Sequence, residues 1–175
     1  SRDLLPNRQL QKQKIKKTNP VIRYSKRNNI QIADTSTIFE SGSELTQGTN
    51  TGRIFASGGK ISSGTSKVDI VANTGIGLTN GSFAGIEFTS LSGNGSGAVA
   101  ELTVQNNAIA GAALTITNGG VGYQVGDLLL MNSVGFNGSG VRVVVIDITK
   151  TNFLVVYNVK DNFIEGLNIT HTTTY

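Results

Sequence analysis

Apolar and polar residues alternate along many short segments of this chain, as they do in β-strands that are buried on one face. In residues 98–104 every second side chain is apolar, from Ala98 to Val104, so these side chains share one side of a strand. Residues 128–131 form a continuous apolar run that suits a strand covered on both sides. Further strands are expected at residues 68–71, 83–91, 114–117, 141–148 and 153–157. The pattern predicts a mostly β protein.

A short phrase that precedes two of these segments occurs twice. Asn-Gly-Ser-Gly stands at residues 94–97 and again at residues 137–140, and each copy leads directly into an apolar strand pattern. Residues 158–167 are a degenerate echo of the glycine-rich phrase at residues 114–127, which lies between the two copies. Repeated phrases of this kind indicate repeated structural units. We therefore expect residues 93–175 to hold two copies of a β unit, packed as a small sandwich or as stacked β-hairpins.

Residues 119–127 join two apolar runs through a glycine-rich turn. A dinucleotide-binding loop has Gly-x-Gly-x-x-Gly followed by a helix, whereas here the third glycine comes one residue late and a strand-like run follows. We therefore interpret the segment as a structural turn in which glycine adopts a positive φ and a tyrosine packs beside it. The residues assigned to this turn are Gly119, Gly120, Gly122, Tyr123, Gly126 and Asp127.

The composition agrees with short strands and tight turns. Of the 175 residues, 22 are glycine and 2 are proline, and cysteine and tryptophan are absent. Without cysteine the chain forms no disulfide and offers no thiolate ligand or nucleophile. No apolar run approaches the roughly 20 residues of a membrane-spanning helix, so we expect a soluble protein.

Positive charge is concentrated at the N-terminus. Residues 1–30 carry nine Lys and Arg against one Asp, whereas the rest of the chain carries six bases and ten acids. Because this stretch has few apolar residues, we expect either a disordered tail in the isolated chain or an arm that becomes ordered on a partner. The expected organisation is an extended basic docking arm at residues 1–45, Gly/Ser/Thr-rich loops and first strands at residues 46–92, and the β repeats at residues 93–175. The arm residues expected to dock are Arg8, Lys12, Lys14, Lys16, Lys17, Arg23, Lys26 and Arg27.

The sequence offers little material for catalysis. His171 is the only histidine and lies in a Thr-rich tail, where we expect a solvated side chain. No local group of carboxylates indicates glycoside hydrolysis and no ligand set indicates a metal, so we expect neither an enzyme nor a cofactor. Tyr24 is the only aromatic residue among the nine N-terminal bases, so contact of the arm with nucleic acid would be electrostatic and nonspecific. We favour docking of the arm on acidic protein neighbours.

The phrases at residues 114–127 and 158–166 resemble the glycine-rich β repeats of structural proteins from tailed bacteriophages, especially cyanophages. In that group, Thr-Asn-Gly-Gly-x-Gly-Tyr and Asn-Val-x-Gly-x-Phe phrases recur in baseplate, tail-fibre and neck components. The resemblance covers less than half of the chain and leaves out the basic arm. Asp161 and Asn162 stand where the second phrase usually has a glycine.

The resemblance implies a non-enzymatic component of a phage virion, assembled in the host cytoplasm. Its partners would be other virion proteins and copies of itself. The alternative is a carbohydrate-binding or adhesion module that recognises a glycan of the host cell surface. A cluster of exposed aromatic side chains would favour this alternative, although the chain has no tryptophan, the residue that sugar platforms prefer.

Overall fold

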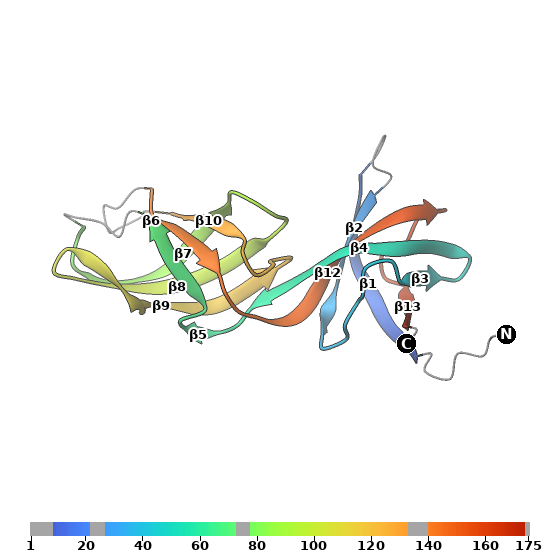
Figure 1. The fold of residues 1–175 in the computed structure, drawn as a ribbon, viewed down its shortest axis with the longest axis horizontal. Coiled ribbons are helices and arrows are strands. Elements are labelled where there is room, and N and C mark those ends of the chain that lie inside the picture. The colour runs from blue at the N-terminus through green and yellow to red at the C-terminus, as the bar shows by residue number, and fades with distance from the viewer. Residues whose placement is uncertain (1–8, 22–26, 73–77, 133–139, 174–175) are drawn as a thin grey trace. The chain divides into compact units, whose positions relative to one another are not determined.

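The computed structural model describes residues 9–21, 27–72, 78–132 and 140–173 (Figure 1). Every helix or strand assigned among these residues is a β-strand, so the predicted mostly β fold class is confirmed. The strands belong to two compact units. The barrel unit comprises Ser1–Ser57 and Thr151–Tyr175, and the sheet unit comprises Gly58–Lys150. Each unit is described by itself.

The barrel unit is built on a closed barrel of six strands. They are β1 (Gln9–Val21), β2 (Arg27–Thr35), β3 (Glu44–Gln47), β4 (Asn50–Ile61), β12 (Ile148–Lys160) and β13 (Asn168–Thr173), and their order around the barrel is β1-β13-β3-β4-β12-β2. The first strand therefore pairs with the last, as in the register Lys12 opposite Thr170. Closure leaves no unpaired strand edge at which another chain could add.

Aliphatic side chains at every second position fill the barrel. On β2 the buried residues are Asn28, Ile30 and Ile32, and the residues between them are only half-buried. Alternate side chains of a strand point to opposite faces, so this pattern sends one isoleucine row inward. The buried apolar residues that share this core are Ile15, Ile30, Ile32, Phe39, Leu45, Ile54, Leu154, Val156, Phe163 and Ile169.

The sheet unit contains one curled antiparallel sheet of seven strands. They are β5 (Gly64–Thr65), β6 (Val68–Ala72), β7 (Gly81–Ser90), β8 (Ser96–Gln105), β9 (Ala108–Val121), β10 (Leu128–Met131) and β11 (Arg142–Val145), in the order β5-β9-β8-β7-β10-β11-β6. Ala100 at the centre of β8 lies opposite Ile86 of β7 and Ile116 of β9. All three side chains are buried, so the alternation seen in residues 98–104 marks the core face of this sheet.

The segment expected as a docking arm belongs to the barrel instead. Gln9–Val21 is β1 and Arg27–Thr35 is β2, and the two pair with each other over most of their lengths. Ile15 is fully buried in the core although lysines surround it in the sequence. The expectation was wrong because a segment with one isoleucine among lysines resembles a polar tail in the sequence. In the structure this segment is a barrel strand, and the other strands supply the apolar partners of Ile15.

The expected two-copy module over residues 93–175 is also not what the chain forms. β8 begins within the first Asn-Gly-Ser-Gly phrase, at Ser96, and lies between β7 and β9, but β11, after the second phrase, lies between β10 and β6. Residues 151–167, expected to complete the second copy, belong to the barrel unit. Residues 133–139, which include most of the second phrase, lie outside the described part. The similar phrases thus precede strands with different neighbours.

Candidate functional site

The glycine-rich turn holds a tyrosine in the hydrophobic core of the sheet unit. Tyr123 is fully buried, and its hydroxyl oxygen accepts a hydrogen bond of 3.2 Å from the backbone N–H of Ala98. Burial raises the pKa of this hydroxyl. Gly120, Gly122 and Gly126 have φ values of 66°, 80° and 96°, in the left-handed region that glycine adopts without strain.

The first Asn-Gly-Ser-Gly phrase packs directly on this turn. A Cβ atom added at Gly95 would lie 2.1 Å from Cδ1 of Tyr123, and one added at Gly93 would lie 2.6 Å from Oδ1 of Asp127. The Asp127 carboxylate accepts a hydrogen bond of 2.9 Å from the backbone N–H of Gln124. In a phosphate loop such a backbone N–H would bind the anionic ligand, but here the carboxylate of the chain itself accepts its hydrogen bond. This geometry suits a structural turn.

The lysine row of β1 is formed by Lys12, Lys14 and Lys16. All three side chains are exposed, and Ile15 between the last two is buried in the barrel. Lys14 lies opposite Asn168 of β13, and a β-bulge between Ile15 and Lys17 precedes the pairing with β2. None of these three ammonium groups forms an ion pair with a described carboxylate, unlike Lys67 in the sheet unit, which pairs with Asp147. The barrel thus presents three charges from one strand.

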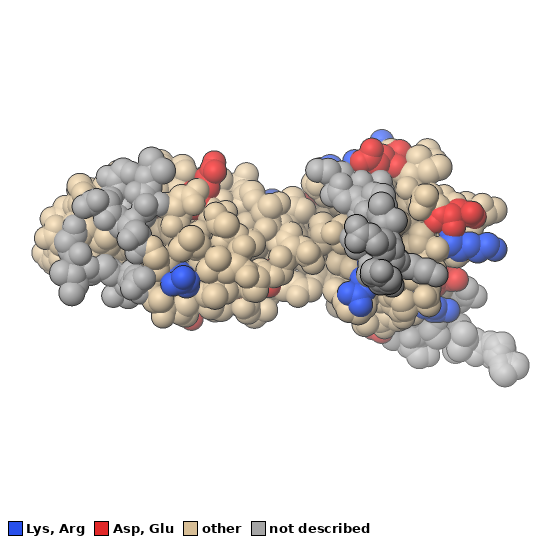
Figure 2. Space-filling model, turned by 90° about the horizontal axis from the view of Figure 1, so that it is seen from above, with Lys and Arg blue, Asp and Glu red and all other residues tan. Residues whose placement is uncertain are grey.

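The other predicted docking residues are placed differently. Arg8, Arg23 and Lys26 lie outside the described residues. Lys17 belongs to β1, where its backbone pairs with Gln31 of β2. In the view of Figure 2 most visible Lys and Arg side chains lie on the barrel unit, interspersed with Asp and Glu. Among the predicted docking residues whose side chains the structure describes, Lys12, Lys14 and Lys16 lie together on β1.

Arg27, the last predicted docking residue, is part of an aromatic cluster that sequence reasoning missed. Its guanidinium carbon lies 3.7 Å from the centre of the Phe55 ring, a cation–π contact. The Phe55 ring meets the Tyr157 ring edge-on, with centroids 6.2 Å apart and an interplanar angle of 83°. The residues come from β2, β4 and β12, which are neighbours in the barrel. Only the strand order reveals this cluster; the one sequence signal is that Phe55 follows the inward-pointing Ile54.

His171 is not a solvated tail residue, as was expected. It lies on β13 between β1 and β3, and its side chain is fully buried. Its Nε2 is 2.7 Å from Oγ of Ser43, and its ring packs on Phe39 with centroids 4.7 Å apart. Burial lowers its pKa, and the charge of Glu40 partly opposes this effect. The expectation failed because the C-terminal segment is a barrel strand.

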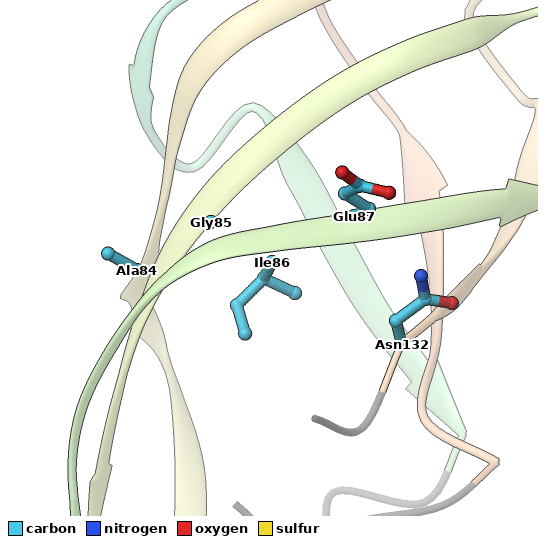
Figure 3. Close-up of a pocket in the computed structure, with 5 residues that line it drawn as sticks. All are labelled: Ala84, Gly85, Ile86, Glu87 and Asn132. Carbon is cyan, nitrogen blue, oxygen red and sulfur yellow. The ribbon is translucent and has the colours of Figure 1, made fainter. Parts of the chain in front are cut away.

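A hollow of about 280 Å³ lies beside β7 in the sheet unit. It is lined by Ala84, Gly85, Ile86, Glu87 and Asn132 (Figure 3). Gly85 has a φ of 69° within a bulge of β7, and the backbone N–H of Asn132 donates to the carbonyl of Glu87. One carboxylate and one amide provide neither a nucleophile with its base nor a metal ligand set.

The described residues include no group of three or more His, Cys, Asp or Glu placed to hold a metal ion. They form no helix that is long and apolar enough to cross a membrane. Comparison of the chain with protein-family models, with curated proteins and with solved structures gives no match.

Proposed function

We propose that the protein is a non-enzymatic structural component of a tailed-bacteriophage virion, from its tail, baseplate, fibre or neck, and that it assembles through contacts with other virion proteins. Support comes from the glycine-rich phrase at residues 114–127, which resembles the β repeats of such proteins. The observation that carries the docking role is the lysine row of β1, three exposed ammonium groups with no described carboxylate partner.

The lysine row is a suitable docking surface because the barrel orders its backbone before any partner arrives. Side chains two residues apart on a regular strand are about 7 Å from each other, so Lys12 and Lys14 lie in line, and Lys16 follows them at the β-bulge. An acidic neighbour gains attraction without first ordering a disordered arm. Charges of this kind mainly accelerate encounter and select partners, rather than supplying most of the affinity.

A charge-neutralising variant tests this role. Replacing Lys12, Lys14 and Lys16 by Gln removes three positive charges from the outer face of β1 and leaves Ile15 in place. The variant is co-expressed with the other structural proteins of the virion, and its amount in purified particles is compared with that of the parent. We expect a large fall in incorporation with an unchanged circular dichroism spectrum.

The matched control changes the net charge by the same amount in the sheet unit. Replacing Ser63, Thr79 and Thr149 by Glu adds three negative charges at exposed positions whose side chains form no described hydrogen bond. This control should enter particles normally. Normal incorporation of the lysine variant would refute docking through β1, and failure of the parent protein to enter particles would refute the virion role itself.

A further inference from the structure

The outer face of β12 carries an apolar row. Phe153, Val155 and Tyr157 alternate with Leu154 and Val156, whose side chains belong to the barrel core. The first three side chains therefore point away from that core. Val155 is nevertheless only 7% exposed, although it is not part of the core cluster. Other side chains on the outside of the barrel must therefore cover Val155. We call the row of Phe153, Val155 and Tyr157 the ridge.

The ridge continues onto the neighbouring strand β4 through Phe55. This ring is 45% exposed and packs edge-on against Tyr157. Arg27, stacked on the Phe55 ring, extends the cluster to β2. An exposed ring held by two neighbours has little freedom to lose when a ligand packs on it, which favours binding.

A polar row runs beside the ridge on β2. Asn29 lies opposite Val155, and Gln31 lies opposite Phe153. Both side chains are half-buried and alternate with the inward Ile30, so they share the outer face with the ridge. Neither amide is hydrogen-bonded to a described residue. Adjacent strands are about 5 Å apart, so Gln31 lies beside Phe153 and Asn29 lies beside Val155 on the outer face.

We propose that this surface, formed by Phe55 and Tyr157 with Asn29, Gln31 and Arg27, binds a neutral polysaccharide. A sugar ring has an apolar C–H face that can pack on Phe55 or Tyr157. Its hydroxyl groups both donate and accept hydrogen bonds, as do the carboxamides of Asn29 and Gln31. The lysine row lies on β1, the strand that pairs with β2, and the proposal adds a glycan-binding activity to the proposed structural role.

Other occupants fit the surface less well. A stable protein interface buries roughly 800 Å² on each partner, usually around large apolar anchors, whereas the ridge has one substantially exposed ring and an already covered valine. A single-stranded nucleic acid needs cations along its backbone beside the stacking rings. The described outer row of β2 holds two neutral amides and Arg27, and on β4 Arg53 is exposed two residues before Phe55, so the gels with polyanions decide between the two classes of ligand.

Affinity electrophoresis tests the proposal with defined probes. The full chain is run in native gels that contain dextran, mannan, arabinogalactan or xylan, and also in gels that contain alginate or poly-dT. We expect at least one neutral polysaccharide to retard the protein, and we expect this retardation to persist at high salt. Retardation by none of the four neutral polymers would overturn the proposal, and so would retardation by the polyanions only.

Variants locate the binding surface. Phe55→Ala, and separately the pair Asn29→Ala and Gln31→Ala, should weaken binding by about tenfold or more, which corresponds to about 1.4 kcal/mol. Ile38→Ala is the matched control, because this barrel-unit side chain is 76% exposed and lies outside the ridge. If Phe55→Ala does not fold, the amide pair still decides the question, since its side chains are outside the core.

The outcomes separate this proposal from the docking role. Unchanged retardation of a folded Phe55→Ala variant or of the amide variant would overturn the glycan site. Equal loss in Ile38→Ala would also overturn it, by showing a nonspecific effect. The Lys12, Lys14 and Lys16 to Gln variant should bind the polysaccharide like the parent, even where it fails to enter particles.

Discussion

Gly95→Ala tests the packing around Tyr123 in the core of the sheet unit with a single methyl group. Gly95 is buried, and its φ lies outside the positive range, so alanine can adopt its backbone conformation. The added Cβ would nevertheless lie 2.1 Å from Cδ1 and 2.4 Å from Cε1 of Tyr123. Real Cβ atoms essentially never come within 3.0 Å of another heavy atom in this way. The Tyr123 ring or the backbone of residues 94–97 must therefore move.

The structure sets the size of the effect. Restoring ordinary van der Waals contact requires a displacement of roughly 1 Å or more in a well-packed interior, and such overpacking costs about 1–3 kcal/mol. Movement of the ring would also loosen the hydrogen bond between the Tyr123 hydroxyl and the backbone N–H of Ala98. Leaving that buried N–H without an acceptor would cost about 1–3 kcal/mol more. We expect a total loss of about 2–6 kcal/mol in the free energy of unfolding of the sheet unit.

Urea and thermal unfolding, followed by near-ultraviolet circular dichroism, measure this loss. For a unit of roughly 60–100 residues each kcal/mol lowers Tm by about 4–8 °C, so the change is easily resolved. Ser96→Ala is the control, because its exposed side chain neighbours the same site and should change stability by less than about 0.5 kcal/mol. In a Tyr123→Leu background, the cost of Gly95→Ala should fall by more than half, since a shorter, flexible side chain can yield. A Gly95→Ala variant as stable as the parent, or an equal cost in both backgrounds, would refute the reasoning.

Three further predictions concern the turn, β1 and the buried histidine. Gly122→Val should destabilise the protein by about 1–3 kcal/mol, because valine is strained at the φ of 80°, and an unchanged Tm would contradict this. Trypsin should cut after Lys12, Lys14 and Lys16 far more slowly in the native protein than in urea, because β1 pairs with β13 from Gln9 to Lys14 and with β2 from Ile15 to Val21; equal rates would show that this segment is unpaired. Because the folded-state pKa of His171 is lowered by burial, the unfolded chain binds its proton more readily, so this contribution to stability is present above about pH 6.5 and is lost as the pH falls. The free energy of unfolding should therefore decrease as the pH falls below about 6.5, and His171→Gln should remove that part of the dependence.

Local patterns predicted the elements whose pairing partners lie nearby in the sequence. The alternation in residues 98–104 corresponds to β8, because its neighbours β7 and β9 are adjacent in the chain and all three share one core face. The apolar run at residues 128–131 corresponds to β10, in which Leu129 and Met131 are buried. Such strands can be recognised because their own residues supply most of the periodic signal.

The barrel could not be predicted in the same way. β1 contributes few core side chains of its own, and its burial depends on pairing Lys12 with Thr170 and Ile15 with Ile32. The first of these pairings joins the two ends of the chain, and no local pattern encodes it. The misplacement of His171 has the same cause, because a Thr-rich C-terminal segment looks solvated until its strand partners are known.

The aromatic cluster could not be predicted from the sequence for a related reason. Arg27, Phe55 and Tyr157 lie far apart in the sequence, and each one by itself is an ordinary outward residue of a strand. Their association follows from the strand order β4-β12-β2. The expectation that an exposed aromatic cluster would favour carbohydrate binding could thus be stated from the sequence, but the residues of that cluster could not.

The closed barrel constrains how this part of the protein can recognise anything. An open sheet can accept an added strand, whose affinity comes mainly from backbone hydrogen bonds and depends little on sequence. A six-stranded closed barrel offers no such edge, so the outer side chains of its strands must provide recognition. Those side chains are chemically divided, with ammonium groups along β1 and aromatic rings with amides along β12 and β2. Substitutions that change one row while preserving the inward isoleucines should therefore alter one binding activity at a time.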